Sequence, residues 1–120
     1  MFKKIFIILI ALFIFAQYTG TSYSAGTDSG SSDSYLQEYK DAEKFVLRAK
    51  KLEKKNKTER AKKLYSKALE KLQKAYKSDK KNPDILNYLG FTLRKTGKLK
   101  EAEKYYLAGL KINPKHNGIN

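Results

Sequence analysis

The stretch PDILNYLGFTLRKTGKLKEAEKYYLAGLKINPKH, residues 83–116, decides the fold of this 120-residue chain. Its apolar residues recur at three- and four-residue steps, the period of a helix with one apolar face. Asn82 can cap such a helix, and Pro83 suits its first position, where the missing N–H costs nothing. Gly97 permits a left-handed turn, and Pro114 prevents a helix from continuing. The stretch therefore predicts two helices joined by a tight turn.

Three small residues suggest how these two helices pack. Gly90, Ala102 and Gly109 carry little or no side chain, so the two backbones can approach closely, and large side chains fill the layers between them. The pattern resembles a tetratricopeptide repeat, a helical hairpin of 34 residues. The signature positions that match are Leu86, Leu89, Gly90, Leu93, Ala102, Tyr106, Gly109 and Pro114. The resemblance implies an all-α fold of antiparallel helical hairpins stacked as a short right-handed solenoid.

Residues 35–82 have the same periodicity but a weaker match. We expect a first helix capped by Ser34 and a second capped by Asn56 and ending near Ser78. The first helix has the apolar stripe Leu36, Tyr39, Ala42, Phe45, Val46, Ala49 and Leu52. Counting back 34 residues from Ala102, Tyr106 and Gly109 gives Ala68, Leu72 and Ala75, whereas the Leu-Gly positions hold Lys55 and Asn56. Residues 35–82 are therefore predicted to form a divergent, extended repeat-like hairpin.

The two ends of the chain carry different signals. Two lysines precede twelve apolar residues, 5–16, which span about 18 Å as a helix and fall short of a ~30 Å membrane core. This favours a signal peptide at 1–24, cut after Ser24, and a protein exported from a bacterial cell to the periplasm or medium. An uncleaved N-terminal anchor is the alternative; after cleavage no transmembrane segment is expected.

The predicted helices are flanked by two short segments, residues 25–34 and 117–120. Residues 25–34 are rich in Ser and Gly and predict a disordered linker. Residues 117–120 occupy the place where a further repeat would start. Because about three repeats are normally needed for stability, we expect a truncated chain or one completed by association.

The composition argues against catalysis. The chain has no cysteine and one histidine, so thiolate zinc sites are excluded and a catalytic histidine would have to be His116. A lone histidine at the end of a helix is most often exposed, and no residues at ligand spacing accompany it. We therefore expect no enzyme activity, no cofactor and no metal.

The charge leaves two readings open. Lys and Arg number 26 against 12 Asp and Glu, a formal net charge of +14. Most lysines lie between apolar positions, as on a solvated helix face, but so large a charge also attracts anionic polymers or membrane surfaces. Nucleic acid is not favoured, because arginine, the usual base and phosphate reader, occurs only three times.

The resemblance also implies a binding groove, because the first helix of each repeat in that family lines a concave surface for a peptide or helix. The residues at those positions are Asp84, Asn87, Phe91, Arg94 and Lys95. Phe91 could instead pack on the neighbouring repeat. The leading hypothesis is a non-enzymatic protein–protein interaction module acting outside the cytoplasm. The alternative is a basic helical protein that binds anionic polymers or membrane surfaces electrostatically.

Overall fold

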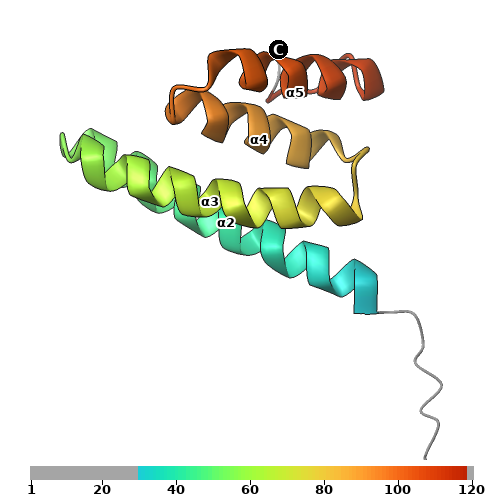
Figure 1. Ribbon diagram of the computed structural model, residues 1–120, viewed down its shortest axis with the longest axis horizontal. Coiled ribbons are helices and arrows are strands. Elements are labelled where there is room, and N and C mark those ends of the chain that lie inside the picture. The colour runs from blue at the N-terminus through green and yellow to red at the C-terminus, as the bar shows by residue number, and fades with distance from the viewer. Residues whose placement is uncertain (1–29, 119–120) are drawn as a thin grey trace, which may run out of the picture.

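The computed structural model describes residues 30–118 and contains four helices (Figure 1). They are α2 (Gly30–Lys54), α3 (Thr58–Ser78), α4 (Pro83–Lys95) and α5 (Leu99–Ile112). α2 and α3 form a first hairpin, α4 and α5 form a second, and α3 packs on α4 to join them. The prediction of an all-α protein built from antiparallel helical hairpins is confirmed. None of the helices between residues 30 and 118 has the length and apolarity needed to cross a membrane.

Both hairpins turn through the same backbone motif. In the second, Gly97 has φ 87°, and the N–H of Lys98 donates to the carbonyl of Leu93 at 2.9 Å. In the first, Asn56 has φ 57°, and the N–H of Lys57 donates to the carbonyl of Leu52 at 2.9 Å. This is the Schellman ending, which places glycine or asparagine in the left-handed region.

Two predicted helix caps are wrong. Asn56 ends α2 instead of capping α3, and the capping position, Lys57, makes no side-chain hydrogen bond. Ser34 lies inside α2, which begins at Gly30. Asp33 lies in the first turn of α2, where its negative charge interacts favourably with the helix dipole and stabilises the helix. Residues 30–34 of the predicted linker therefore belong to this helix. Residues 25–29, the predicted signal peptide at 1–24 and residues 119–120 lie outside the described residues.

The start of α4 follows the prediction. The side-chain oxygen of Asn82 accepts hydrogen bonds from the N–H groups of Asp84 at 3.0 Å and Ile85 at 3.3 Å, and Pro83 occupies the first turn. Asp79 in turn accepts a hydrogen bond from the Asn82 side chain at 3.3 Å. These bonds fix the direction in which α4 leaves the loop after α3.

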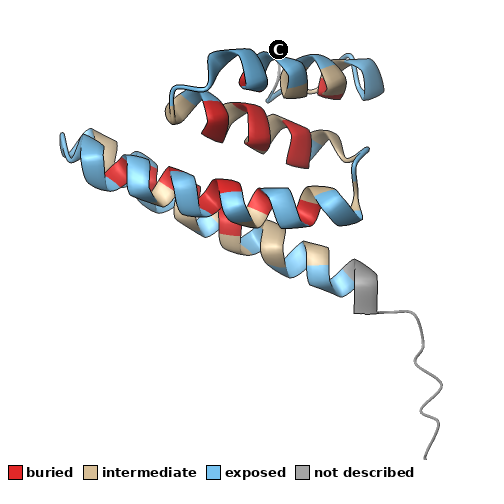
Figure 2. Cartoon of the chain, in the orientation of Figure 1, coloured by how far each residue is buried: buried red, intermediate tan, exposed pale blue. Residues whose placement is uncertain are grey.

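One continuous core runs between the helices (Figure 2). Its buried residues include Val46 and Ala49 from α2, Tyr65 and Leu72 from α3, Ile85, Leu89 and Leu93 from α4, and Ala102 from α5. The expectation that Leu36 belongs to the apolar stripe of α2 is wrong, since this residue is 40% exposed.

Measured from their turns, the two hairpins share one pattern of small residues. Ala49, Ala61 and Ala68 in the first hairpin stand at the same distances from Asn56 as Gly90, Ala102 and Gly109 stand from Gly97. All six are buried. Both hairpins thus place small residues at the same spacing from the turn. The two turn residues, Asn56 and Gly97, are 41 positions apart (97 − 56), so the 34-residue count that matched Ala68 to Ala102 is wrong, and Ala61 is the counterpart of Ala102.

The first hairpin is longer than the second. α3 has 21 residues and α5 has 14, a difference that amounts to about 10 Å of helix at 1.5 Å per residue. Figure 1 shows the turn between α2 and α3 lying beyond the turn between α4 and α5. The end of the first hairpin consequently projects past the rest of the described chain.

Candidate partner-binding groove

The first helices of the two hairpins, α2 and α4, contact each other through side chains along one face, which we call the groove face. Four pairs of residues make these contacts: Tyr39 with Tyr88, Glu43 with Tyr88, Lys50 with Phe91, and Glu53 with Lys95. The five residues predicted for the groove all lie on α4, and these contacts show what surrounds them.

Asp84 and Asn87 lie at one end of the groove face, beside an open hollow of about 520 Å³. The hollow is lined from α2 by Tyr39 and Glu43, from α4 by Tyr88, and by the segment 113–118 that follows α5. The Tyr88 hydroxyl donates to Glu43 at 3.3 Å. Burial, followed by the neighbouring Glu43 carboxylate, raises the pKa of Tyr88, so its hydroxyl stays protonated and able to donate.

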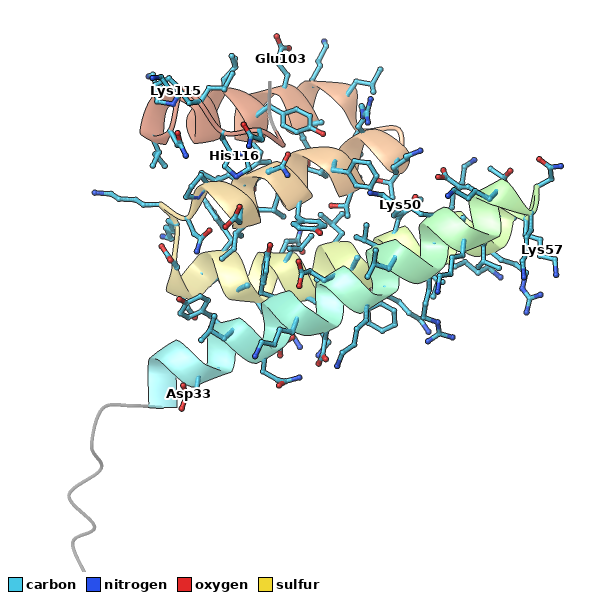
Figure 3. All side chains as sticks on the ribbon, turned by 180° about the vertical axis from the view of Figure 1, so that it is seen from behind. Asp33, Lys50, Lys57, Glu103, Lys115 and His116 are labelled. Atoms are coloured by element: carbon cyan, nitrogen blue, oxygen red, sulfur yellow. The ribbon has the colours of Figure 1, made fainter. Side chains whose placement is uncertain are left out.

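His116 closes this end of the groove face. Its Nε2 lies 2.8 Å from the Asp84 carboxylate, and its Nδ1 accepts a hydrogen bond from the N–H of Gly118 at 3.2 Å. Figure 3 shows His116 directed back toward α4. Its side chain is only 12% exposed, so the expectation of an exposed histidine is wrong. The physical reason is that the segment after α5 folds back and pairs this ring with Asp84.

Phe91 lies further along α4 and is half-buried. Its ring meets Tyr65 of α3 edge to face, with 5.8 Å between ring centroids. Lys50 Nζ lies 4.8 Å from the ring centroid, and Arg94 and Lys95 each approach to 5.7 Å. Phe91 thus packs on the neighbouring hairpin, the alternative that the sequence left open, and also forms the centre of a cluster of cations.

Lys95 is held within the protein. Its Nζ lies 3.0 Å from both carboxylate oxygens of Glu53, and the hydroxyl of Tyr65 donates to the same carboxylate at 2.9 Å. Burial opposes ionisation of Glu53, but the hydrogen bonds from Lys95 and Tyr65 outweigh it and lower the pKa of Glu53. Lys95 therefore joins the two hairpins, and of the five predicted residues it is the one most fully engaged by an ion pair.

Arg94 is exposed at this end of the groove face. It lies near the Phe91 ring, and while burial raises the pKa of Tyr106 on α5, the nearby Arg94 opposes that rise. The structure thus places Arg94, Phe91 and Lys95 together, whereas Asp84 and Asn87 are separated from them along α4 and face the hollow.

The geometry can be compared with known proteins at this point. Residues 83–116 match the tetratricopeptide repeat. These are the same 34 residues whose pattern carried the resemblance, and they contain α4, α5 and all five predicted groove residues. No curated protein and no solved structure matches the chain.

The match also clarifies the packing inside the tetratricopeptide repeat. Leu86, Leu89 and Leu93 are each 1% exposed or less, and Gly90 faces the ring of Tyr106. The signature residues of α4 therefore lie in the core of the repeat and leave the groove face to other positions, whereas the signature residue Pro114, which follows α5, is exposed.

Reasoning from the sequence missed the residues that α2 contributes to the groove face. Tyr39, Glu43 and Lys50 recur at helical spacing and lie opposite the tetratricopeptide repeat. The sequence places Tyr39 in the apolar stripe of the first helix, and Glu43 and Lys50 enter it only as part of the total charge. Their spacing, four and then seven residues, was the available signal.

The groove face is suited to binding. No three His, Asp or Glu side chains gather within residues 30–118 as a metal ion would require. The residues present instead offer hydrogen-bonding side chains and carboxylates near the start of α4, and an aromatic ring with cations toward its end. Such a surface can hold an extended segment through apolar contacts, hydrogen bonds and charge.

Proposed function

We propose that this chain is a non-enzymatic protein–protein interaction module that acts outside the cytoplasm and binds a partner segment along the groove face. The observation that carries the proposal is the tetratricopeptide repeat at residues 83–116, a motif typical of protein–protein interaction. Proteins that contain tetratricopeptide repeats are usually non-enzymatic.

The side chains of the groove face support a binding role. Asn87 is half-buried beside the hollow and offers amide hydrogen bonds, while Phe91 offers part of a ring. Arg94 is exposed next to that ring, in the combination of aromatic and guanidinium groups that is frequent at interface hot spots. A partner segment lying along α4 would meet Asn87 first and the Phe91 cluster next.

The proposal is tested by selecting peptides from a random library on the full chain and measuring their affinity for variants. We expect Phe91→Ala with Arg94→Ala to weaken binding at least tenfold. The matched control is Leu107→Ala with Lys111→Ala, which removes an exposed apolar residue and a cation from α5. If both double variants lose the same peptide affinity, or if neither loses any, the assignment of the groove face as the binding site is wrong. Arg94→Ala alone is a second test that leaves the packing of Phe91 on Tyr65 in place.

Export rests on the sequence of the N-terminus, which lies outside the described residues. The twelve apolar residues after two lysines and the serines at positions 22 and 24 support cleavage after Ser24. Mass spectrometry of the protein made in its own cell should give an N-terminus at Ala25 in the medium or periplasm. An intact Met1 on the mature protein would disprove cleavage.

A further inference from the structure

The turn end of the first hairpin, residues 48–63, carries half of the net charge of the chain. We call this segment the hairpin tip. It contains nine basic residues and two acidic ones, a net +7, within 16 of the 120 residues. The basic residues are Arg48, Lys50, Lys51, Lys54, Lys55, Lys57, Arg60, Lys62 and Lys63.

Both acidic residues of the hairpin tip are already paired. Glu53 is bound by Lys95 at 3.0 Å, and Glu59 lies 3.4 Å from Lys62. They therefore do not neutralise the remaining cations. Figure 3 shows Lys57 at the extreme end of the hairpin, away from α4 and α5.

Four of the remaining cations surround one hollow. Arg48, Lys51, Lys55 and Arg60 line a depression of about 270 Å³ together with two leucines, Leu52 and Leu64. Within residues 30–118 none of these four cations forms an ion pair, and all four are exposed. Like charges gathered without a counter-charge repel one another, and an anion at the hollow would relieve that repulsion.

The hollow is also lined by apolar side chains, and this distinguishes an anionic lipid surface from a soluble polyanion as the binding partner. Leu52 and Leu64 are half-buried there, and Leu47, one turn from Lys51 on α2, is 56% exposed. A soluble polyanion requires only the cations. An anionic lipid surface uses cations for its headgroups and apolar side chains for the boundary beneath them. Because the turn between α2 and α3, which bears Lys57, lies beyond α4 and α5, a flat surface can approach the tip from that end (Figures 1 and 3).

We propose that the hairpin tip docks on an anionic lipid surface, with the hollow formed by Arg48, Lys51, Lys55 and Arg60 receiving phosphate-bearing headgroups. The hollow is distinct from the groove face, because Lys50 and Glu53, the two tip residues that contact α4, do not line it. Docking there would leave the groove free to bind a partner while the tip holds the protein at the surface.

The test measures binding of the full chain to vesicles of phosphatidylglycerol and phosphatidylcholine, and of phosphatidylcholine alone, at 0.15 M salt. The tip variant is Arg48→Gln, Lys51→Gln, Lys55→Gln and Arg60→Gln. The matched control, Lys74→Gln, Lys77→Gln, Lys80→Gln and Lys111→Gln, removes the same charge from exposed residues elsewhere. Residues 5–16 are identical in every variant, so any lipid affinity of that segment cancels. Circular dichroism checks that each variant keeps its helices.

The tip variant should bind the anionic vesicles at least tenfold more weakly, and the control less than threefold. A cation near an anionic surface contributes about 1 kcal/mol, or roughly fivefold in affinity, so four well-placed cations suffice. Equal weakening in the two variants would show that only net charge matters and would overturn the proposal.

A second variant separates a lipid surface from a soluble polyanion. Leu47→Asn keeps all charges and should weaken binding to the anionic vesicles while leaving binding to fluorescent polyphosphate unchanged. If Leu47→Asn has no effect on vesicles, or if polyphosphate binds as tightly as vesicles and loses as much in the tip variant, the lipid assignment is wrong.

Discussion

Gly90 gives the sharpest test of how closely α4 and α5 pack. A Cβ added at Gly90 would lie 2.6 Å from Cε1, 2.7 Å from Cδ1 and 2.8 Å from Cζ of the Tyr106 ring. Carbon atoms in good contact are about 3.5–4.0 Å apart, so Gly90→Ala requires the ring or a helix to move by about 1 Å. Overpacking of this kind costs about 1–3 kcal/mol.

The same substitution also has a favourable effect. Alanine is better than glycine inside a helix by about 1 kcal/mol. We therefore expect Gly90→Ala to lower the free energy of unfolding by about 1 kcal/mol, or the melting temperature by about 4–8 °C. In a Tyr106→Ala background the ring is absent, only the helix preference remains, and Gly90→Ala should stabilise by about 1 kcal/mol.

The two effects are separated by a double-mutant cycle. Urea unfolding of the four proteins is followed by circular dichroism, with sucrose added so that the least stable variant remains folded at the start. The expected coupling between Gly90 and Tyr106 is about 2 kcal/mol. If Gly90→Ala changes stability by the same amount in both backgrounds, the ring does not limit the approach of the helices and the packing argument fails.

Two further substitutions test the helix cap and the ion pair between hairpins. Asn82→Ala removes the acceptor for the N–H groups of Asp84 and Ile85 and should cost about 1 kcal/mol in thermal unfolding, whereas Asn82→Asp should retain most of the stability; equal losses would refute the cap. Glu53→Gln should destabilise by about 1 kcal/mol at neutral pH, through its bonds to Lys95 and Tyr65. Because folding lowers the pKa of Glu53, its contribution is present above the unfolded pKa of about 4.3 and is lost as the pH falls through the folded value. The difference between wild type and Glu53→Gln should therefore shrink below about pH 4, and a difference that persists at pH 2 would contradict the assignment.

The helices could be predicted from the sequence where a local signal was unambiguous. Asn82 and Pro83 start α4, and Gly97 ends it, because each residue type has one strong preference in that context. The prediction for Asn56 is wrong because asparagine suits both a helix N-cap and a left-handed helix end. Only the packing of α2 on α3 decides between these two uses.

The residues of the groove face could be predicted only in part, because some of them come together only through the tertiary packing. Positions on α4 followed from the repeat pattern, but Tyr39 and Glu43 reach the groove face because α2 crosses next to α4. The pairing of His116 with Asp84 likewise depends on the path of the chain after α5. Such contacts join residues 32 to 49 positions apart, and no local pattern encodes them.

The order of the helices has a consequence for how the chain folds. Each helix packs on the helix next to it in the sequence, so both hairpins form by closing short loops, which favours rapid folding. The first hairpin can assemble during synthesis, before α5 has left the ribosome. The ion pair between Glu53 and Lys95 spans 42 residues and forms only when the two hairpins dock. It therefore belongs to the last step of folding, after each hairpin has buried its own small-residue seam.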